Sequence, residues 1–316
     1  MQITRRSFMA ASALAVATFR SPKPVSAQGN TRKILFIASP ASHGYGEHEH
    51  PAGCSLLADR LNAVGGIEAE VVVNWPEDES IIYNADAVII YADGGQDQII
   101  KGRGETLQKL TESKTGIGIM HWALDPPKNQ RRAVYDAIGG FFALNWSVNP
   151  MWTAECTQFS EHPVTNGVKP FTIRDEWYYH MKFAPKNITP LLSVLPPVET
   201  LVRRDGPYSN NTYVRKAVLA EKRPQHLAWA YTRKNGGRGF GFTGGHFHIN
   251  WANDNYRKLI LNAAAWLAGI ETPQEGIQSK TPGYEELFEP LGEPPKSFNP
   301  EKAKEQLQEW KSNSGR

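Results

Sequence analysis

Cysteine is scarce in this chain of 316 residues, which has only Cys54 and Cys156. Two cysteines form at most one disulfide, so the chain is not a small disulfide-built scaffold. The sequence leaves open whether the two pair or remain as buried free thiols. Neither has neighbours in the sequence that would activate a catalytic thiol.

A large excess of charge and a long apolar run are also missing. The net charge is +3, which is too small to indicate a nucleic-acid partner. After the N-terminal segment no run approaches the roughly 20 apolar residues of a membrane helix, so we expect no membrane span in the mature chain. Hydrophobic residues make up 40% of the sequence, which is enough for a substantial core.

Residues 1–27 have the pattern of an export signal. The pair Arg5 and Arg6 precedes a mild apolar stretch at 9–19, and Val25-Ser26-Ala27 is typical of a cleavage site. The paired arginines indicate the twin-arginine route, and an ordinary secretory signal with two chance arginines is the alternative. Both predict a periplasmic or extracellular protein.

Apolar runs of strand length alternate with amphipathic helical patterns after residue 32. The strands are expected at 33–38, 70–73, 87–91 and 115–120, and the helices at 52–64, 101–112 and 129–138. Such β-α-β-α order predicts an α/β fold with a doubly wound, mostly parallel sheet and helices on both faces, within a single domain at 32–270.

The second half is less regular. Residues 141–223 either extend the sheet or cover its edge, and a hairpin over 228–242 leads to a helix at 254–268. The tail at 271–316 is rich in Pro, Glu and Lys, so we expect it to bury little and to be partly extended, with a surface helix at 301–310.

Six of the nine histidines gather in three short runs that each follow a predicted strand. The runs hold His43, His48 and His50, then His121, then His246 and His248. Loops at the carboxyl edge of a parallel sheet are where open α/β folds bind ligands. The three runs are therefore predicted to meet in one crevice.

Imidazole nitrogens and carboxylates are the usual ligands of catalytic Zn²⁺ and related ions. The predicted metal ligands are His43, His48, His50 and His248. Glu47, Glu49 and Glu176 are candidate oxygen ligands or general bases. The cofactor is otherwise unidentified, and a divalent metal such as Zn is the one considered.

These residues also have plainer explanations. His48 and His50 could be part of a solvated segment that starts a helix, with Glu47 and Glu49 near its N-terminus. His121 could be packed and bonded to the backbone. His162, His180 and His226 are interpreted as structural.

The order of parts resembles the ThuA-like (trehalose utilisation) family, a branch of the class I glutamine-amidotransferase-like fold. The motifs that carry the resemblance are the strand-then-histidine at 118–121, the turn at 162–167, Asp175-Glu176-Trp177-Tyr178, and 239–246 followed by Asn250-Trp251 and the helix through Trp266. The resemblance implies a flavodoxin-like domain with its site at the carboxyl edge, and a link to sugar metabolism.

Amidotransferases of this fold carry a cysteine nucleophile in the turn that His121 occupies here. Imidazole cannot form the same thioester, so the chain is not expected to be a glutamine amidotransferase. The catalytic residues predicted are His121 and His246 as an acid-base pair, with Glu176 tuning or assisting them and His43 as the third histidine.

Several aromatic and polar residues lie in or beside the same segments. Aromatic faces suit sugar rings, although most tryptophans serve core packing. The predicted substrate-binding residues are Asp93, Gly94, Trp122, Trp177, Tyr178 and Asn250.

We therefore expect an exported protein that acts on a carbohydrate or oxidised sugar derivative by hydrolysis or elimination. The expected partner is a small saccharide or sugar derivative. The alternative is a non-catalytic module on the same fold that binds a sugar or a protein partner. A Ser42 nucleophile is disfavoured because no Gly-x-Ser-x-Gly elbow surrounds it. The oligomeric state is not fixed by the sequence.

Overall fold

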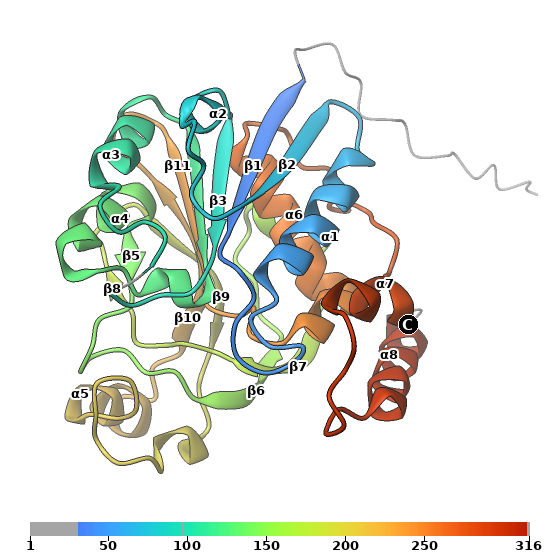
Figure 1. The fold of residues 1–316 in the computed structure, drawn as a ribbon. Coiled ribbons are helices and arrows are strands. Elements are labelled where there is room, and N and C mark those ends of the chain that lie inside the picture. The colour runs from blue at the N-terminus through green and yellow to red at the C-terminus, as the bar shows by residue number, and fades with distance from the viewer. Residues whose placement is uncertain (1–30, 97, 315–316) are drawn as a thin grey trace, which may run out of the picture.

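The computed structural model describes residues 31–96 and 98–314, so the predicted export signal at 1–27 lies outside the described residues. Its centre is a seven-stranded sheet in the order β2-β1-β3-β4-β11-β10-β9 (Figure 1). The strands are β1 (Arg32–Ala38), β2 (Ile67–Val73), β3 (Ala87–Tyr91), β4 (Gly116–Met120), β9 (Ile188–Val194), β10 (Gln225–Thr232) and β11 (Arg238–Phe242). Strand β10 alone runs opposite to the other six strands of this sheet. The predicted mostly parallel sheet is confirmed.

Helices cover both faces of this sheet, as predicted. On one side lie α1 (His50–Asn62) and α6 (Asp254–Leu267), and on the other α3 (Gly104–Glu112) and α4 (Arg131–Ile138) (Figure 1). Successive residues of β1 point to opposite faces. Phe36 accordingly belongs to the core under α1 and α6, whereas Leu35 and Ile37 belong to the core under α3 and α4.

The start of α6 is fixed by its own sequence. The side-chain oxygen of Asn253 accepts hydrogen bonds from the backbone N–H groups of Asn255 and Tyr256, so it caps the helix. The helix is buried along most of its length. It therefore holds the loop that joins it to β11, which lies at the carboxyl edge of the sheet.

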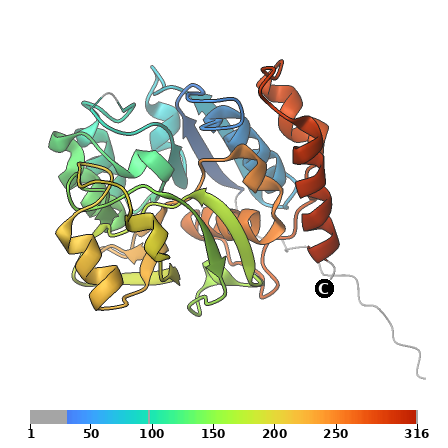
Figure 2. The same cartoon turned by 90° about the horizontal axis from the view of Figure 1, so that it is seen from below.

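The middle of the chain both extends the sheet and covers its carboxyl edge. Strand β9 joins the sheet, while β6 (Met151–Cys156) and β7 (Phe171–Glu176) form a separate antiparallel pair. Figure 2 looks onto this edge and shows the pair beside the segment around α5 (Thr212–Arg215). The remaining elements are the short helix α2 (Ser80–Tyr83) and the paired strands β5 (Gly140–Phe141) and β8 (Lys182–Phe183).

The C-terminal tail contradicts the expectation that it buries little. It forms α7 (Tyr284–Phe288) and α8 (Pro300–Ser314). Leu287, Phe288 and Leu307 are at most 5% exposed and join the core on the α1 side. These few apolar residues lie in a segment rich in Glu, Lys and Pro, so average composition concealed the face that they form.

Two further expectations concern the cysteines and the membrane. Cys54 and Cys156 are both buried and free, so they do not form a disulfide. Within 31–96 and 98–314 no helix has the length and apolar character needed to cross a membrane.

Candidate metal and catalytic site

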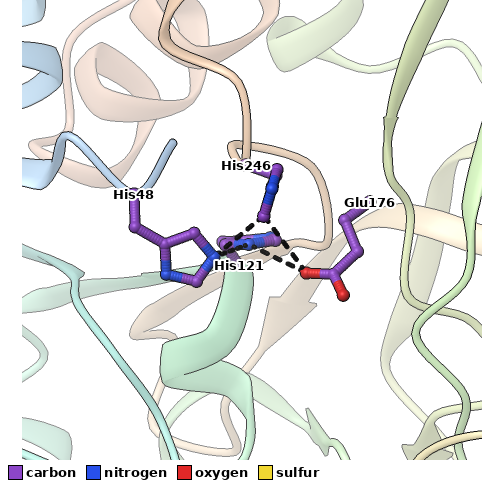
Figure 3. Close-up of side chains that lie close together, drawn as sticks. All are labelled: His48, His121, Glu176 and His246. Atoms are coloured by element: carbon purple, nitrogen blue, oxygen red, sulfur yellow. Dashed lines mark hydrogen bonds and ion pairs between the residues drawn. The ribbon is translucent and has the colours of Figure 1, made fainter. Parts of the chain in front are cut away.

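Four ionisable side chains from four separate segments meet at the carboxyl edge of the sheet (Figure 3). They are His48, His121, Glu176 and His246, called the histidine–glutamate cluster below. One ligand atom of each lies within 4.8 Å of one ligand atom of every other. The cluster joins three residues predicted as catalytic with one predicted as a metal ligand.

The spacing of these atoms suits a metal ion. Nε2 of His48 is 2.9 Å from Nδ1 of His246 and 3.1 Å from Nε2 of His121. Oε2 of Glu176 is 3.3 Å from Nδ1 of His246 and 3.5 Å from Nε2 of His121. Ligands about 2.0–2.2 Å from one ion in a tetrahedron are about 3.3–3.6 Å apart. Small movements would therefore bring the three imidazoles into coordination, with Oε2 of Glu176 beside the fourth position.

Strained backbone directs two of these histidines inward. His48 has φ of 48° and His121 has φ of 56°, both in the left-handed region that non-glycine residues rarely adopt. His121 follows β4 directly and turns sharply there. Such conformations persist where surrounding contacts enforce them, and they concentrate at functional sites.

Asp93 determines which nitrogen of His48 carries a proton. Its Oδ1 lies 2.7 Å from Nδ1 of His48 and also accepts a hydrogen bond from Oγ of Ser42 at 2.9 Å. Burial raises the pKa of Asp93, but the hydrogen bonds from His48 and Ser42 outweigh it and leave the pKa lowered. An ionised carboxylate only accepts, so Nδ1 donates and Nε2 of neutral His48 presents a lone pair to the cluster.

The backbone carbonyl of Thr243 likewise determines which nitrogen of His121 carries a proton. The Nδ1 of this ring is 3.1 Å from the carbonyl oxygen of Thr243, which can only accept. The Nε2 of neutral His121 is therefore unprotonated. Complete burial, followed by the nearby His48 and His246, holds the pKa of His121 well below its usual value. With both rings neutral, two lone pairs face each other across 3.1 Å, which is unfavourable unless a proton or a metal ion lies between them.

The buried carboxylate of Asp175 positions His246. It accepts hydrogen bonds from the backbone N–H groups of Gly245 at 2.9 Å and His246 at 3.0 Å, and from the hydroxyl of Tyr256. Burial alone would lower the pKa of His246, but the hydrogen bond and charge of Glu176 outweigh it, and the pKa is raised. His246 therefore holds a proton more readily than His121 does.

Two neighbours orient the Glu176 carboxylate. Asn149 donates to Oε1 at 3.0 Å and the hydroxyl of Tyr178 donates to Oε2 at 3.2 Å. The Tyr178 ring also stacks on His121, with centroids 4.8 Å apart. The Glu176 side chain is 13% exposed, whereas those of His121 and His246 are 0% and 4% exposed. Glu176 thus faces the accessible side of the cluster.

The other histidines predicted as metal ligands lie outside this cluster. His43 is exposed and stacks on His48 at 3.8 Å, so His48 and not His43 is the third histidine beside His121 and His246. The buried ring of His50 contacts the Ser39 hydroxyl at 3.1 Å. His248 is buried against the backbone of Leu287.

A second group of possible ligands consists of His43, His48 and Asp93. It shares His48 with the histidine–glutamate cluster. The other nitrogen of His48 already bonds Asp93 at 2.7 Å, and a metal ion on that nitrogen would displace this bond. The geometry therefore favours the histidine–glutamate cluster, with Asp93 as the outer partner of one of its ligands.

The predicted substrate-binding residues divide into two sets. Asp93, Gly94 and Trp122 are partly exposed beside the cluster. A Cβ on Gly94 would lie 2.1 Å from the backbone oxygen of Trp122, so only glycine allows this close approach. Trp177, Tyr178 and Asn250 are 0%, 2% and 1% exposed and present almost no surface to a ligand in this conformation.

Sequence reasoning missed Asp175, Asn149 and Thr243, which orient three members of the cluster. Asp175 gave one usable signal, because it precedes a predicted site residue, Glu176, in a strand-like segment. Thr243 acts through its backbone carbonyl, which no side-chain pattern reveals.

Comparison with known proteins agrees with the fold. A family model described as ThuA, trehalose utilisation, matches residues 34–267. A crystal structure of a ThuA-like protein from Bacteroides uniformis has a TM-score of 0.54 and 18% identity, covering 78% of this chain and 95% of that one. A ThuA-like protein from Parabacteroides merdae has a TM-score of 0.49 and 15% identity, covering 80% and 98%.

A glutamine amidotransferase from Thermotoga maritima is also similar, with a TM-score of 0.40 and 12% identity over 91% of this chain and 95% of that one. No curated protein sequence matches the chain. At these identities the structural likenesses concern the fold alone.

Proposed function

The chain belongs to the ThuA family, and from that premise we propose that it is a metal-dependent hydrolase or lyase acting on a carbohydrate or oxidised sugar derivative. The histidine–glutamate cluster is the proposed catalytic centre. Its three imidazoles would hold a divalent ion such as Zn²⁺, and Glu176 would transfer the proton.

One observation carries the metal part of this proposal. The Nε2 atoms of His48 and His121 lie 3.1 Å apart in a buried site, and the other nitrogen of each ring bonds an outer acceptor. A metal ligand whose second nitrogen donates to a carboxylate or a backbone carbonyl is the usual arrangement in metalloproteins. Here the second nitrogen of His48 bonds the carboxylate of Asp93, and that of His121 bonds the backbone carbonyl of Thr243.

The greater exposure of Glu176 supports its role in proton transfer, beside imidazoles that would hold the ion. Three imidazoles leave a coordination position open for substrate or water, as catalytic metal sites require. A bound ion would polarise a substrate oxygen or lower the pKa of water. Glu176 lies on the accessible side, with Oε2 within 3.5 Å of the His121 and His246 nitrogens. From there its carboxylate can take a proton from water or from a sugar hydroxyl or C–H group.

A metal-free mechanism is the second candidate. The pKa of His246 is raised, by Glu176 against the effect of burial, whereas burial lowers that of His121. Neighbouring groups with opposite shifts can serve as acid and base. Hydrolysis or elimination would then use His246 as the proton donor and His121 or Glu176 as the acceptor.

The substrate class and the location have their own support. The family description refers to a disaccharide, and Trp122 is partly exposed with its ring 5.5 Å from that of His43. A ring in that position could cover the apolar face of a sugar. The proposed export to the periplasm or beyond is supported by Arg5, Arg6 and the apolar stretch after them.

Metal analysis combined with turnover tests the proposal. We expect one divalent ion per chain in the purified protein, lost in His121→Ala and His246→Ala but kept in His226→Ala, a control whose ring bonds Ser193 elsewhere. On a panel of glycosides and oxidised glycosides, the cluster variants should lose activity by a factor on the order of 10² or more.

Other outcomes of the metal analysis and the turnover assays would favour a different function or exclude the site. Turnover by metal-free protein would favour the acid-base pair. Saccharide or protein binding without metal or turnover would indicate the non-catalytic module instead. Unchanged turnover in both cluster variants would exclude this site altogether.

A further inference from the structure

Tyr45 connects the histidine loop, residues 43–50, to the C-terminal tail. Its ring lies 4.8 Å from that of Phe298 and 6.2 Å from that of Phe288, measured between centroids. Its hydroxyl donates to the backbone oxygens of Phe288 at 3.3 Å and Gly292 at 3.4 Å. In Figure 1 this loop passes beside α7. A residue between two site histidines is therefore anchored in residues 284–298.

The same loop is joined by its backbone to the segment that carries His246. The N–H of His48 donates to the oxygen of His246 at 3.0 Å, and the N–H of His248 donates to the oxygen of Gly46 at 2.8 Å. Glu47 and Phe247 form an isolated β-bridge. A displacement of Tyr45 would therefore move both His48 and His246.

Hydrogen bonds within the histidine loop and the contact of His48 with Asp93 also hold it, but little of it is regular structure. Before α1 begins at His50, its regular structure consists of that single bridge. His43 and His48 both have left-handed φ values, of 68° and 48°. Left-handed conformations in non-glycine residues persist only when surrounding contacts hold them. The contacts of Tyr45 with the tail are among those available to do so.

We propose that residues 284–298 act through Tyr45, as a positioning residue, to set the metal affinity of the histidine–glutamate cluster. This inference rests on the proposed metal site. The family match ends at residue 267, so the contribution comes from a segment beyond the matched part of the chain. The site is then completed by residues that touch none of its ligand atoms.

Four variants of the full chain separate this role from general packing. Tyr45→Ala and Phe298→Ala remove the contact from either side, and Tyr45→Phe keeps the ring and loses only two long hydrogen bonds. Trp310→Ala is the control, because it removes an aromatic residue of the same tail that packs on the core at α8. Metal affinity is measured with Zn²⁺ against a chelator of known affinity.

We expect Tyr45→Ala and Phe298→Ala to weaken Zn²⁺ binding about ten-fold or more, within the range found for outer partners of metal ligands. Tyr45→Phe should restore most of it, and Trp310→Ala should leave it unchanged. Equal weakening in all four variants, or none in Tyr45→Ala, would overturn the proposal, because tail docking would then act only on overall stability.

Hydrogen exchange keeps this test separate from that of the metal site. The His48 amide should exchange at least several-fold faster in metal-free Tyr45→Ala and Phe298→Ala than in Trp310→Ala, with the Ile89 amide in the central sheet as reference. If wild-type protein binds no Zn²⁺ but this difference is found, the metal proposal fails while the anchoring role of Tyr45 stands. Unchanged exchange would overturn the anchoring role itself.

Discussion

At the scale of single residues, proton positions decide what the histidine–glutamate cluster can do. Asp93 and the Thr243 carbonyl each accept a hydrogen bond from one imidazole, and so turn the other nitrogen of that ring inward. Without these two acceptors, His48 and His121 could each adopt the opposite tautomer. The cluster would then contain N–H groups that cannot bind a cation.

Replacing Asp93 by Asn should weaken metal binding by about 10–100-fold, because the amide loses the charge that makes the His48 nitrogen a strong ligand. Competition with a chelator measures this change. Asp86→Asn is a matched control, since the Asp86 side chain is 28% exposed and pairs with Arg32, and that of Asp93 is 29% exposed. Equal affinity in the two variants would contradict the assigned role of Asp93.

The sequence predicted part of this residue-scale picture. Histidines after predicted strands indicated which side chains gather at the carboxyl edge, and His121, His246 and Glu176 do lie together. The preference for His43 as the third histidine differs from the structure, in which the loop turns at two left-handed residues and places His48 beside His121 and His246. Side-chain patterns carry no information about such a reversal, so position after a strand was a poor guide within that loop.

At the scale of elements, the turn after β4 is the most constrained part of the site. Its backbone turns left-handed at His121, directly after a strand with every residue buried. The strand fixes where the turn begins, and the close contact of Gly94 with Trp122 fixes the residues that follow. The imidazole is therefore held at an angle that a relaxed loop would not give it.

This strain predicts an order of stability between two variants. His121→Gly should be more stable than His121→Ala by about 1 kcal/mol, because glycine adopts positive φ without steric cost. Urea unfolding of metal-free protein measures the difference. At exposed Gln108 within α3 the order should reverse, since alanine favours a helix. An alanine variant at His121 as stable as the glycine variant would show that the turn is unstrained.

The strands and helices near the site were largely predictable, as was the helix at 301–310, but the burial of the tail was not. Buried parallel strands such as β3 and β4 are uninterrupted apolar runs, which the sequence displays directly. Helices α7 and α8 bury a few apolar residues, such as Leu287 and Leu307, within mostly polar segments. Only the surface against which they pack makes that pattern visible.

At the scale of the whole molecule, buried neutral histidines make stability depend on pH. Burial lowers the pKa of His50 and of His248 to about 4, and that of His121 well below its usual value. Their unfolded forms have a pKa near 6.5, so below about pH 6.5 the unfolded state binds more protons than the folded state. Stability then falls with falling pH. His246, with its raised pKa, contributes in the opposite direction.

Metal-free protein should therefore lose stability between about pH 6.5 and 4, by up to about 1.4 kcal/mol per pH unit for each such histidine. Urea unfolding at several pH values measures this. His248→Gln should reduce the slope of the unfolding free energy against pH by the contribution of roughly one proton, since it removes one buried titrating group. A slope identical to that of the wild type would mean that His248 does not titrate as its burial indicates.

The positions of the cluster residues along the chain determine when the site can form. His48 and His246 lie 198 residues apart, and each member of the cluster follows or ends a different strand. During synthesis, almost the entire domain is made between His48 and its last partner in the cluster, His246. The residues that contact Tyr45 are made after His246. Completion of the site is thus a late event in folding, and capture of an ion would report that the whole chain, tail included, has reached its native arrangement.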